Sequence, residues 1–258
     1  MARLAAVSIV ITSTEYLAAP RHLRDDGLMS WTVSSARESW LVTTAIGRGL
    51  EAIFAYPRVL VLIALRGVLA LALLFGPSWM SGQAAIVGTL ALTSVLVMLR
   101  SIYGQDGADH MVVIVYVSLT LAALVPTPTA RAAALWFIAL QGCLSYATAG
   151  IAKVISPLWR DGTHLIRVMG TKSYGNPTVS DYLNAHRVVA RMVAIFIILW
   201  ESAFPFVLFL PAPAAAAVLV VGALFHLSNA FVMGLNTFVW SFIATYPAIL
   251  YCVQNRPW

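Results

Sequence analysis

The residues best suited to chemistry are the few ionisable side chains that interrupt long apolar runs. Lys153, Glu201, His226 and Arg66 are four of them, and His110 stands where another apolar run begins. An ionisable side chain within a membrane span is costly and is by default a functional candidate. The chemistry open to these residues is proton transfer, ion pairing and hydrogen bonding to a buried ligand.

Lys153 ends the run LSYATAGIAK, and Tyr146 precedes it by two helical turns on the same face. Ala149 and Gly150 are small, so another helix or a flat ligand can approach closely. Loss of hydration disfavours the charged form of an amine, which would make Lys153 usable as a general base. The alternative is a lysine that extends to the membrane surface beside Trp159, and the residues alone favour that alternative.

Arg66 interrupts the run VLIALRGVLALALLF and is predicted to pair with Glu201 or with backbone carbonyls. A purely structural ion pair is one interpretation of this arginine. Pro205 lacks the N–H that would bind the carbonyl of Glu201, so the helix is weakened beside this carboxylate. Glu201 is therefore either an acceptor for a ligand hydroxyl or a lysine, or a satisfied glutamate at a kink.

His226 and Asn229 lie three residues apart and share a helix face. One histidine and one amide make a poor metal site, so hydrogen bonding to a buried ligand or to another helix is expected. The stretch GQDGADH contains Asp106, Asp109 and His110, but its spacing matches no calcium loop, and Asp109 is a good helix cap. The sequence therefore predicts no metal site.

Composition defines the setting of these residues. The chain has 258 residues, of which 60% are hydrophobic and 10% charged, and its mean hydropathy is +0.86, whereas soluble domains carry about a quarter charged residues. The net charge of +6 comes mainly from scattered arginines, a pattern that favours contact with anionic lipid over nucleic acid. We therefore expect an integral membrane protein with no nucleic-acid partner.

Seven apolar runs are long enough to cross a bilayer as helices. They are 59–76, 83–99, 110–125, 132–153, 188–209, 212–233 and 236–253. Because lipid-exposed backbone must satisfy its own hydrogen bonds, the sequence predicts an all-α bundle of about seven spans. Residues 58–258 form this membrane domain, and residues 1–57 form an N-terminal segment with an interfacial amphipathic helix. The distribution of arginine and lysine places the N-terminus in the cytoplasm.

Several of these residues together resemble the vitamin K-dependent gamma-carboxylase superfamily, which includes bacterial proteins with a horizontally transferred transmembrane (HTTM) domain. The superfamily pattern Y-x-x-A-G-x-x-K…W-x-x-G is matched by Tyr146, Ala149, Gly150, Lys153, Trp159 and Gly162. Arg66, His110, the stretch WESAFPF and the stretch FHLSNAFVMGLNTFVW match further motifs in the same order. The resemblance runs from about residue 58 to the end of the chain.

The resemblance implies a membrane enzyme that uses a reduced quinone, similar to vitamin K or menaquinol, with O2 and CO2, to modify a peptide. In that scheme Lys153 is the base that acts on the quinone, and His110 stabilises charge during carboxylation. The residues that would bind the cofactor are Tyr146, Glu201, His226, Asn229, Arg66 and Trp159.

The chain resembles most the small bacterial membrane component of systems that mature sporulation-delaying-protein toxins. This implies a place in the bacterial cytoplasmic membrane, a secreted peptide as substrate, and a separate partner protein that recognises the peptide. The alternative function is a non-catalytic membrane subunit for maturation of such a toxin, or for immunity to it. In that case the polar residues only pack helices.

Overall fold

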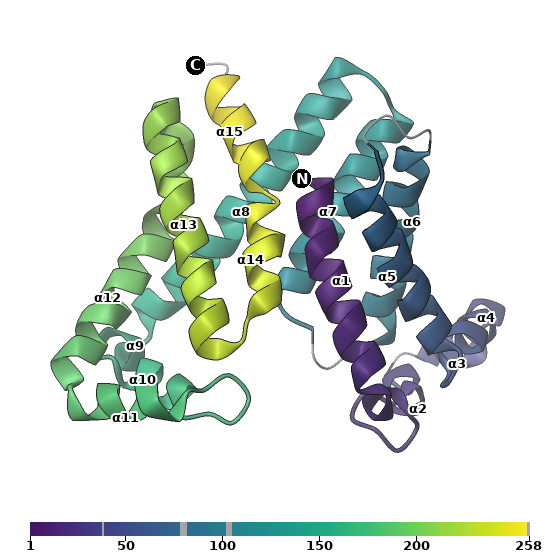
Figure 1. The fold of residues 1–258 in the computed structure, drawn as a ribbon, viewed down its shortest axis with the longest axis horizontal. Coiled ribbons are helices and arrows are strands. Elements are labelled where there is room, and N and C mark those ends of the chain that lie inside the picture. Colours follow the sequence, from purple (N-terminus) through teal and green to yellow (C-terminus); the bar gives the residue numbers. More distant parts are fainter. Residues whose placement is uncertain (38, 78–81, 102–104, 257–258) are drawn as a thin grey trace. The chain divides into compact units, whose positions relative to one another are not determined.

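The computed structural model describes residues 1–258 except 38, 78–81, 102–104 and 257–258. The described residues contain helices and no strand, which confirms the predicted all-α class. The chain divides into two compact units, unit 1 (Met1–Ala134) and unit 2 (Leu135–Trp258). Helix α8 (Pro128–Ile155) begins in unit 1 and continues in unit 2 (Figure 1).

Within the described part of the chain, six helical segments are long and apolar enough to cross a membrane. They are α6 (Gln83–Arg100), α7 (Gly107–Leu124), α8, Arg187–Phe209, α13 (Ala212–Met233) and Asn236–Gln254. Helices α4 (Ala45–Phe54) and α5 (Val59–Phe75) are bent by 72° and pass the same test only as a pair. The described residues therefore contain six candidate spans, or seven if the bent pair is one span, and the sequence predicts about seven.

Unit 1 is a bundle in which α1 (Ala2–Ala18) packs along α5 and against α7, while α6 packs on α5 and α7 (Figure 1). Small residues permit the close contact of α1 with α5. Gly67 of α5 lies against Ser13 of α1, since a Cβ at Gly67 would stand 3.2 Å from the Ser13 Cβ. The first helix is therefore part of the helical core of unit 1.

The interfacial amphipathic helix predicted within residues 1–57 is not one helix in the structure, because the chain after α1 is divided into short elements. They are η1 (Pro20–Leu23), α2 (Trp31–Ser35), α3 (Ser39–Thr43) and α4. The side chains of Ser30 and Thr44 cap α2 and α4 by accepting backbone N–H groups, and such caps interrupt a continuous helix. Apolar residues of these elements face inward, in a cluster formed by Trp31, Leu41, Phe54, Leu62 and Val97.

Arg100, the last residue of α6, holds this segment in place. Its buried guanidinium donates three hydrogen bonds of 3.0 Å, to the carbonyls of Phe54, Met29 and Leu23. The C-terminal end of a helix carries partial negative charge, which favours a cation there. Carbonyls from α4, η1 and the loop between η1 and α2 are thereby tied to α6.

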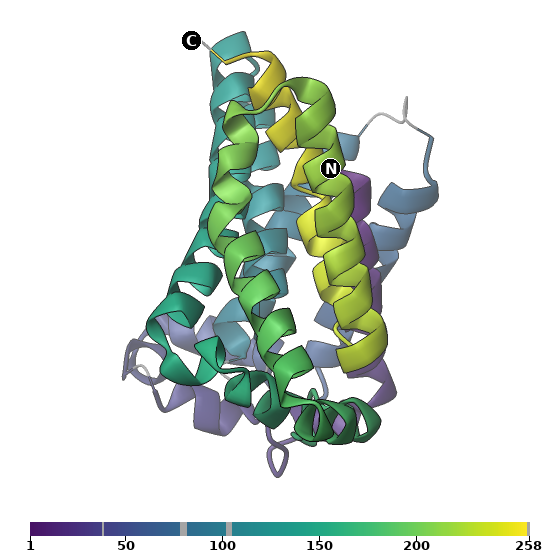
Figure 2. The ribbon, with the colours of Figure 1, turned by 90° about the vertical axis from the view of Figure 1, so that its left-hand side faces the viewer.

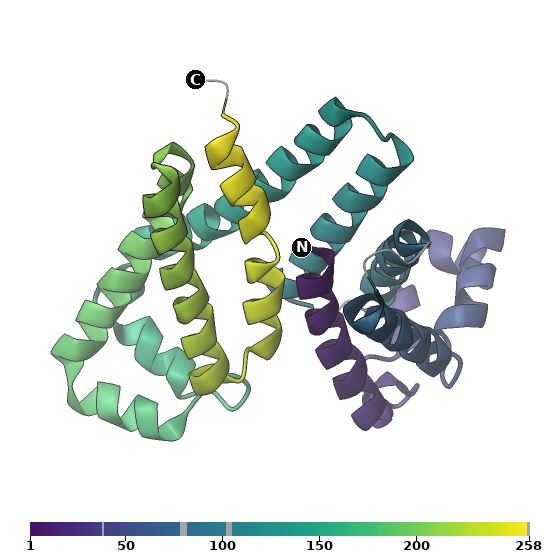
Figure 3. The ribbon, with the colours of Figure 1, turned by 45° about the horizontal axis from the view of Figure 1, so that its top comes forward.

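Unit 2 combines long apolar helices with a group of short ones. Its elements after α8 are α9 (Pro157–Arg160), α10 (Thr163–Met169), α11 (Pro177–Ala185), α12 (Arg187–Ala203), η2 (Phe204–Phe209), α13, α14 (Asn236–Ile243) and α15 (Tyr246–Gln254). The short helices α9, α10 and α11 pack together and against α12 (Figure 2). Helix α13 packs along α14 and contacts α15 (Figure 3).

Two of the predicted runs are broken by proline. The run 188–209 is α12 followed by the 3-10 turn η2, which contains Pro205. The run 236–253 is α14 followed by α15, in which Pro247 occupies the first turn. Because proline cannot donate a backbone hydrogen bond, it is tolerated at a helix start and not within one. The second break brings Tyr246 into the core of unit 2.

Candidate functional site

Lys153 and Glu201 form a largely buried ion pair in unit 2. The Lys153 Nζ lies 2.6 Å from the Glu201 Oε2, and the two side chains are 17% and 9% exposed. Lys153 comes from the last turn of α8 and Glu201 from the end of α12. The Nζ also lies 3.4 Å from the carbonyl of Ala149. The structure thus gives Lys153 a carboxylate partner, which is one of the two roles that the sequence left open for Glu201.

Glycine lets α8 and α12 approach closely enough to form this pair. A Cβ at Gly150 would stand 2.5 Å from both the backbone N and the Oγ of Ser202. Gly162, with φ of +85°, also lies against α12, and a Cβ there would stand 2.7 Å from the Arg191 N. Side chains at these two positions would push the helices apart, so both glycines serve the contact with α12.

The turn after α8 covers one side of Lys153. The Nζ of Lys153 lies 5.1 Å from the ring centroid of Trp159, within the range of a cation–π contact. Asp161 accepts a hydrogen bond of 2.8 Å from the backbone N–H of Thr163. That hydrogen bond lowers the pKa of the exposed Asp161 carboxyl below its ordinary value. Of the residues predicted to bind the cofactor, Trp159 and Glu201 are the ones that lie directly beside Lys153.

A second polar cluster in unit 2 centres on Tyr146. Its hydroxyl oxygen lies 2.6 Å from the Nε2 of His226 and 3.1 Å from the hydroxyl of Tyr246. The Tyr146 ring stacks on Phe204 with centroids 3.8 Å apart. These residues come from α8, α13, α15 and η2, so the cluster joins four elements of unit 2.

Aromatic rings enclose His226. Phe242 stacks on the imidazole with centroids 4.5 Å apart, and Phe225 meets it at 5.4 Å. Phe238 lies further away at 6.4 Å. The imidazole is therefore held among flat apolar rings, with Tyr146 as its polar neighbour.

Three polar atoms of unit 2 are buried without a hydrogen-bond partner in the described chain. They are the Nε1 of Trp200, the Oγ of Ser202 and the Nδ1 of His226. Leaving a buried donor or acceptor unpaired costs about 1–3 kcal/mol. Two of these atoms belong to the neighbours of Glu201 in the chain. Unit 2 thus has hydrogen-bonding capacity that its own described residues do not use.

Asn229 faces a different part of unit 2 from His226. It lines an apolar groove of about 390 Å³ between α10, α11, α12 and α13. Leu165, Met169, Val193, Phe196 and Phe225 also line this groove. His226 and Asn229 therefore do not act together: His226 is hydrogen-bonded to Tyr146, and Asn229 lines the groove.

The remaining predicted residues, His110 and Arg66, belong to unit 1. His110 lies at the start of α7, exposed, with its Nδ1 2.9 Å from the carbonyl of Asp106. Arg66 is 3% exposed, and its Nε has no hydrogen-bond partner in the described residues. Arg66 interacts electrostatically with Asp109. Of the two partners predicted for Arg66, Glu201 or backbone carbonyls, Glu201 pairs with Lys153 instead.

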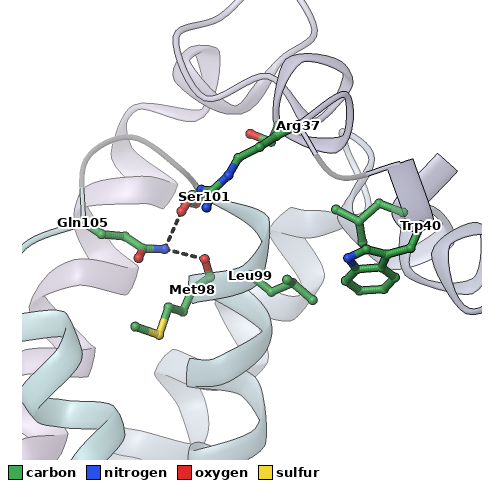
Figure 4. Close-up of a pocket in the computed structure, with 8 residues that line it drawn as sticks. Arg37, Trp40, Met98, Leu99, Ser101 and Gln105 are labelled. Atoms are coloured by element: carbon green, nitrogen blue, oxygen red, sulfur yellow. Dashed lines mark hydrogen bonds between the residues drawn. The ribbon is translucent and has the colours of Figure 1, made fainter.

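Unit 1 contains an open pocket of about 420 Å³ between α2, α3 and the end of α6. Figure 4 shows Gln105 beside Met98 and Ser101, with the Arg37 side chain extending toward Ser101 and Trp40 on the far side of the pocket. The Gln105 amide donates to the carbonyls of Met98 and Ser101. Gln105 and Met98 also line a cavity of about 10 Å³ next to Arg66, which has room for about one water molecule.

The structure brings together Lys153 with Glu201 and Trp159, and Tyr146 with His226. The sequence does not single out Tyr246, because the apolar run 236–253 predicts one continuous helix. Pro247 was the sequence feature that indicated the break.

Comparison of the chain with models of known protein families, with curated proteins and with solved structures gave no match. The fold and the site define an all-helical protein with membrane-length apolar helices and a buried acid–base pair in unit 2.

Proposed function

We propose that the chain is an integral membrane enzyme in which Lys153 and Glu201 act as an acid–base pair on a reduced quinone-type compound, in the modification of a peptide. The observation that supports this proposal is the ion pair at 2.6 Å, formed by two side chains that are 17% and 9% exposed. The membrane is the bacterial cytoplasmic membrane, and the N-terminus is cytoplasmic. A separate protein supplies recognition of the peptide.

The pair can change its protonation state without exchanging protons with water. Transfer of one proton from the Lys153 Nζ to the Glu201 Oε2 leaves a neutral amine and a neutral carboxylic acid. A low-dielectric setting disfavours isolated charges, so the neutral pair is accessible there. The Lys153 amine can then accept a proton from a bound hydroxyl group, and Glu201 stores the first proton until it is returned.

The aromatic cluster of unit 2 suits a flat, lipid-soluble cofactor. Phe204 stacks on Tyr146 and Phe242 stacks on His226, and the Nδ1 of His226 is a buried polar atom without a partner in the described chain. A reduced quinone, when bound, supplies electrons for chemistry with O2, and CO2 is a further substrate if the peptide is carboxylated. Tyr146 and His226 would hold the ring, and the groove lined by Asn229 suits an apolar tail. The roles of Arg66 and His110 stay predictions.

The test is purification of the full chain in mild detergent, followed by mass spectrometry for bound quinones. Wild-type protein should retain a quinone, and Lys153→Gln should retain it while losing turnover. Arg131→Gln, at an exposed position in the first turn of α8, is the matched control and should behave as wild type. Absence of any quinone from active wild-type protein would overturn the proposal.

A second candidate function rests on the same ion pair. Buried pairs also occur as purely structural contacts between helices. In this function the chain is a non-catalytic membrane subunit for maturation of, or immunity to, a secreted peptide toxin. It requires that replacement of Lys153 and Glu201 together leaves function intact, and that a partner protein raises the stability of the chain.

A further inference from the structure

Arg66 is a buried cation that its described surroundings leave incompletely bonded. Its side chain belongs to a residue that is 3% exposed, and its Nε has no hydrogen-bond partner among the described residues. Glu201, one of the two partners that the sequence predicts for it, pairs with Lys153. Because a buried charge is stable only when it is paired and hydrogen-bonded, Arg66 needs a further partner.

The cavity of about 10 Å³ beside Arg66 is the place for that partner. Helices α1, α5, α6 and α7 supply Tyr16, Arg66, Ser94 and Asp109 to its wall. Ser94 is 3% exposed, and its Oγ also lacks a hydrogen-bond partner among the described residues. Two buried and unpaired polar groups from different helices thus line one cavity.

The size of this cavity limits its occupant to one water-sized molecule. A cavity needs about 10–15 Å³ of probe-occupied volume to hold a water molecule, and the water needs two to four polar partners. The cavity of about 10 Å³ shares Met98 and Gln105 with the open pocket of about 420 Å³ (Figure 4). The two spaces are therefore neighbours, and a small molecule has a short way in from the open pocket.

The charges around the cavity favour a neutral occupant. Asp109 interacts with Arg66 electrostatically, without a direct hydrogen bond between the two side chains in the described structure. The guanidinium disfavours a cation in the cavity, and the carboxylate disfavours an anion. A guanidinium only donates hydrogen bonds and an ionised carboxylate only accepts them, whereas a serine hydroxyl does both. The occupant must therefore accept on one side and donate on the other, as water does.

We infer that this cavity binds a single water molecule, which accepts a hydrogen bond from the Arg66 Nε–H and donates to the Asp109 carboxylate and the Ser94 hydroxyl. Arg66 and Asp109 then form a water-mediated ion pair that joins α5 to α7, and Ser94 joins α6 to it. Three hydrogen bonds are typical of a buried water. The site belongs to unit 1 and does not depend on the chemistry proposed for unit 2.

The test is NMR of the full chain, labelled with nitrogen-15 at arginine and reconstituted in lipid nanodiscs. The signal of the Arg66 Nε–H is the one lost in Arg66→Lys, which keeps the charge. We expect through-space magnetisation transfer from water to this proton, recognised in the rotating frame by a sign opposite to that of chemical exchange. Absence of this transfer in folded wild-type protein would overturn the water site.

Two variants of Ser94 separate a bound water from the serine hydroxyl. Ser94→Val fills the cavity and should abolish the transfer, whereas Ser94→Ala leaves space for a water held by Arg66 and Asp109 and should retain it. Ser13→Ala is the matched control, because it removes another buried, unpaired hydroxyl of unit 1 from a residue outside the described lining of the cavity. Transfer that persists in folded Ser94→Val, or that is already lost in Ser94→Ala, would contradict the inference.

An anion as the occupant is tested in the same wild-type samples. Replacing chloride by bromide in the buffer should leave the nitrogen-15 shift of the Arg66 Nε unchanged, because the site holds a neutral molecule. A saturable change of this shift with bromide concentration would assign the cavity to an anion and overturn the inference.

Discussion

The ion pair between Lys153 and Glu201 should be coupled strongly enough to measure in a double-mutant cycle. The variants are Lys153→Met, Glu201→Met and the double variant. The double variant replaces both charged side chains by apolar side chains of similar size. The Nζ and Oε2 lie 2.6 Å apart, and the side chains are only 17% and 9% exposed, so water screens the pair weakly. Removing one partner of such a pair costs about 3–5 kcal/mol, because the other charge is left buried and unpaired.

The two single variants should differ. Glu201→Met leaves an ammonium that still contacts the Ala149 carbonyl at 3.4 Å and the Trp159 ring at 5.1 Å. Lys153→Met leaves a carboxylate for which the described chain offers no second cation within ion-pair distance. We therefore expect the larger loss in Lys153→Met. The double variant should fall within about 1 kcal/mol of wild type, because apolar replacement of a buried pair is often neutral.

The assay is reversible unfolding in mixed micelles, followed by circular dichroism, which yields the free energy of unfolding of each variant. The exposed pair Arg24–Asp26, at 3.4 Å and with side chains 57% and 77% exposed, serves as the control cycle. Its coupling should lie below about 1 kcal/mol. Additive effects of Lys153→Met and Glu201→Met, with coupling no larger than in the control, would refute the reasoning.

Three further predictions concern the scaffold. Arg100→Gln removes the donors to the carbonyls of Phe54, Met29 and Leu23, and each of these hydrogen bonds contributes about 1.5–3 kcal/mol. Tryptic cleavage near Arg24 should therefore be faster in this variant. An unchanged cleavage rate would contradict the role of Arg100 in holding this segment to α6. Gly150→Ala should lower the free energy of unfolding by about 1–3 kcal/mol, because its Cβ would meet Ser202 at 2.5 Å, whereas Gly88→Ala, with the nearest atom at 3.5 Å, should be nearly neutral. Asp106→Ala should cost about 0.5–2 kcal/mol, because Asp106 accepts the N–H groups of Ala108 and Asp109 at the start of α7, and a loss within error would contradict this cap.

The helices of this protein were predictable because its apolar runs end at proline, glycine or polar residues. The run 212–233 coincides with α13, and the run 83–99 with nearly all of α6. The break between α14 and α15 was not predicted, although Pro247 lies there, because the apolar pattern continues across it. Segment length and polarity are local properties, so they can be read from the chain without knowledge of packing.

The partners of the polar residues were not predictable in the same way. Lys153 and Glu201 are separated by 48 positions in the chain, and only the packing of α8 on α12 through Gly150 brings them together. The sequence marks both residues as costly within an apolar run, but it leaves Glu201 with either Arg66 or a lysine as its partner. The three carbonyls bound by Arg100 are backbone groups, and every residue type has a backbone carbonyl, so the sequence cannot indicate them.

The most direct test of the proposed acid–base pair is turnover of a reduced quinone by a protein that lacks the pair but remains folded. Lys153→Met/Glu201→Met provides that protein if its free energy of unfolding matches wild type. Wild-type protein in nanodiscs, supplied with a reduced menaquinone analogue, O2, CO2 and its peptide, should consume the quinol, and the double variant should not. Equal consumption by the two proteins would show that Lys153 and Glu201 are a packing contact and not a catalytic pair.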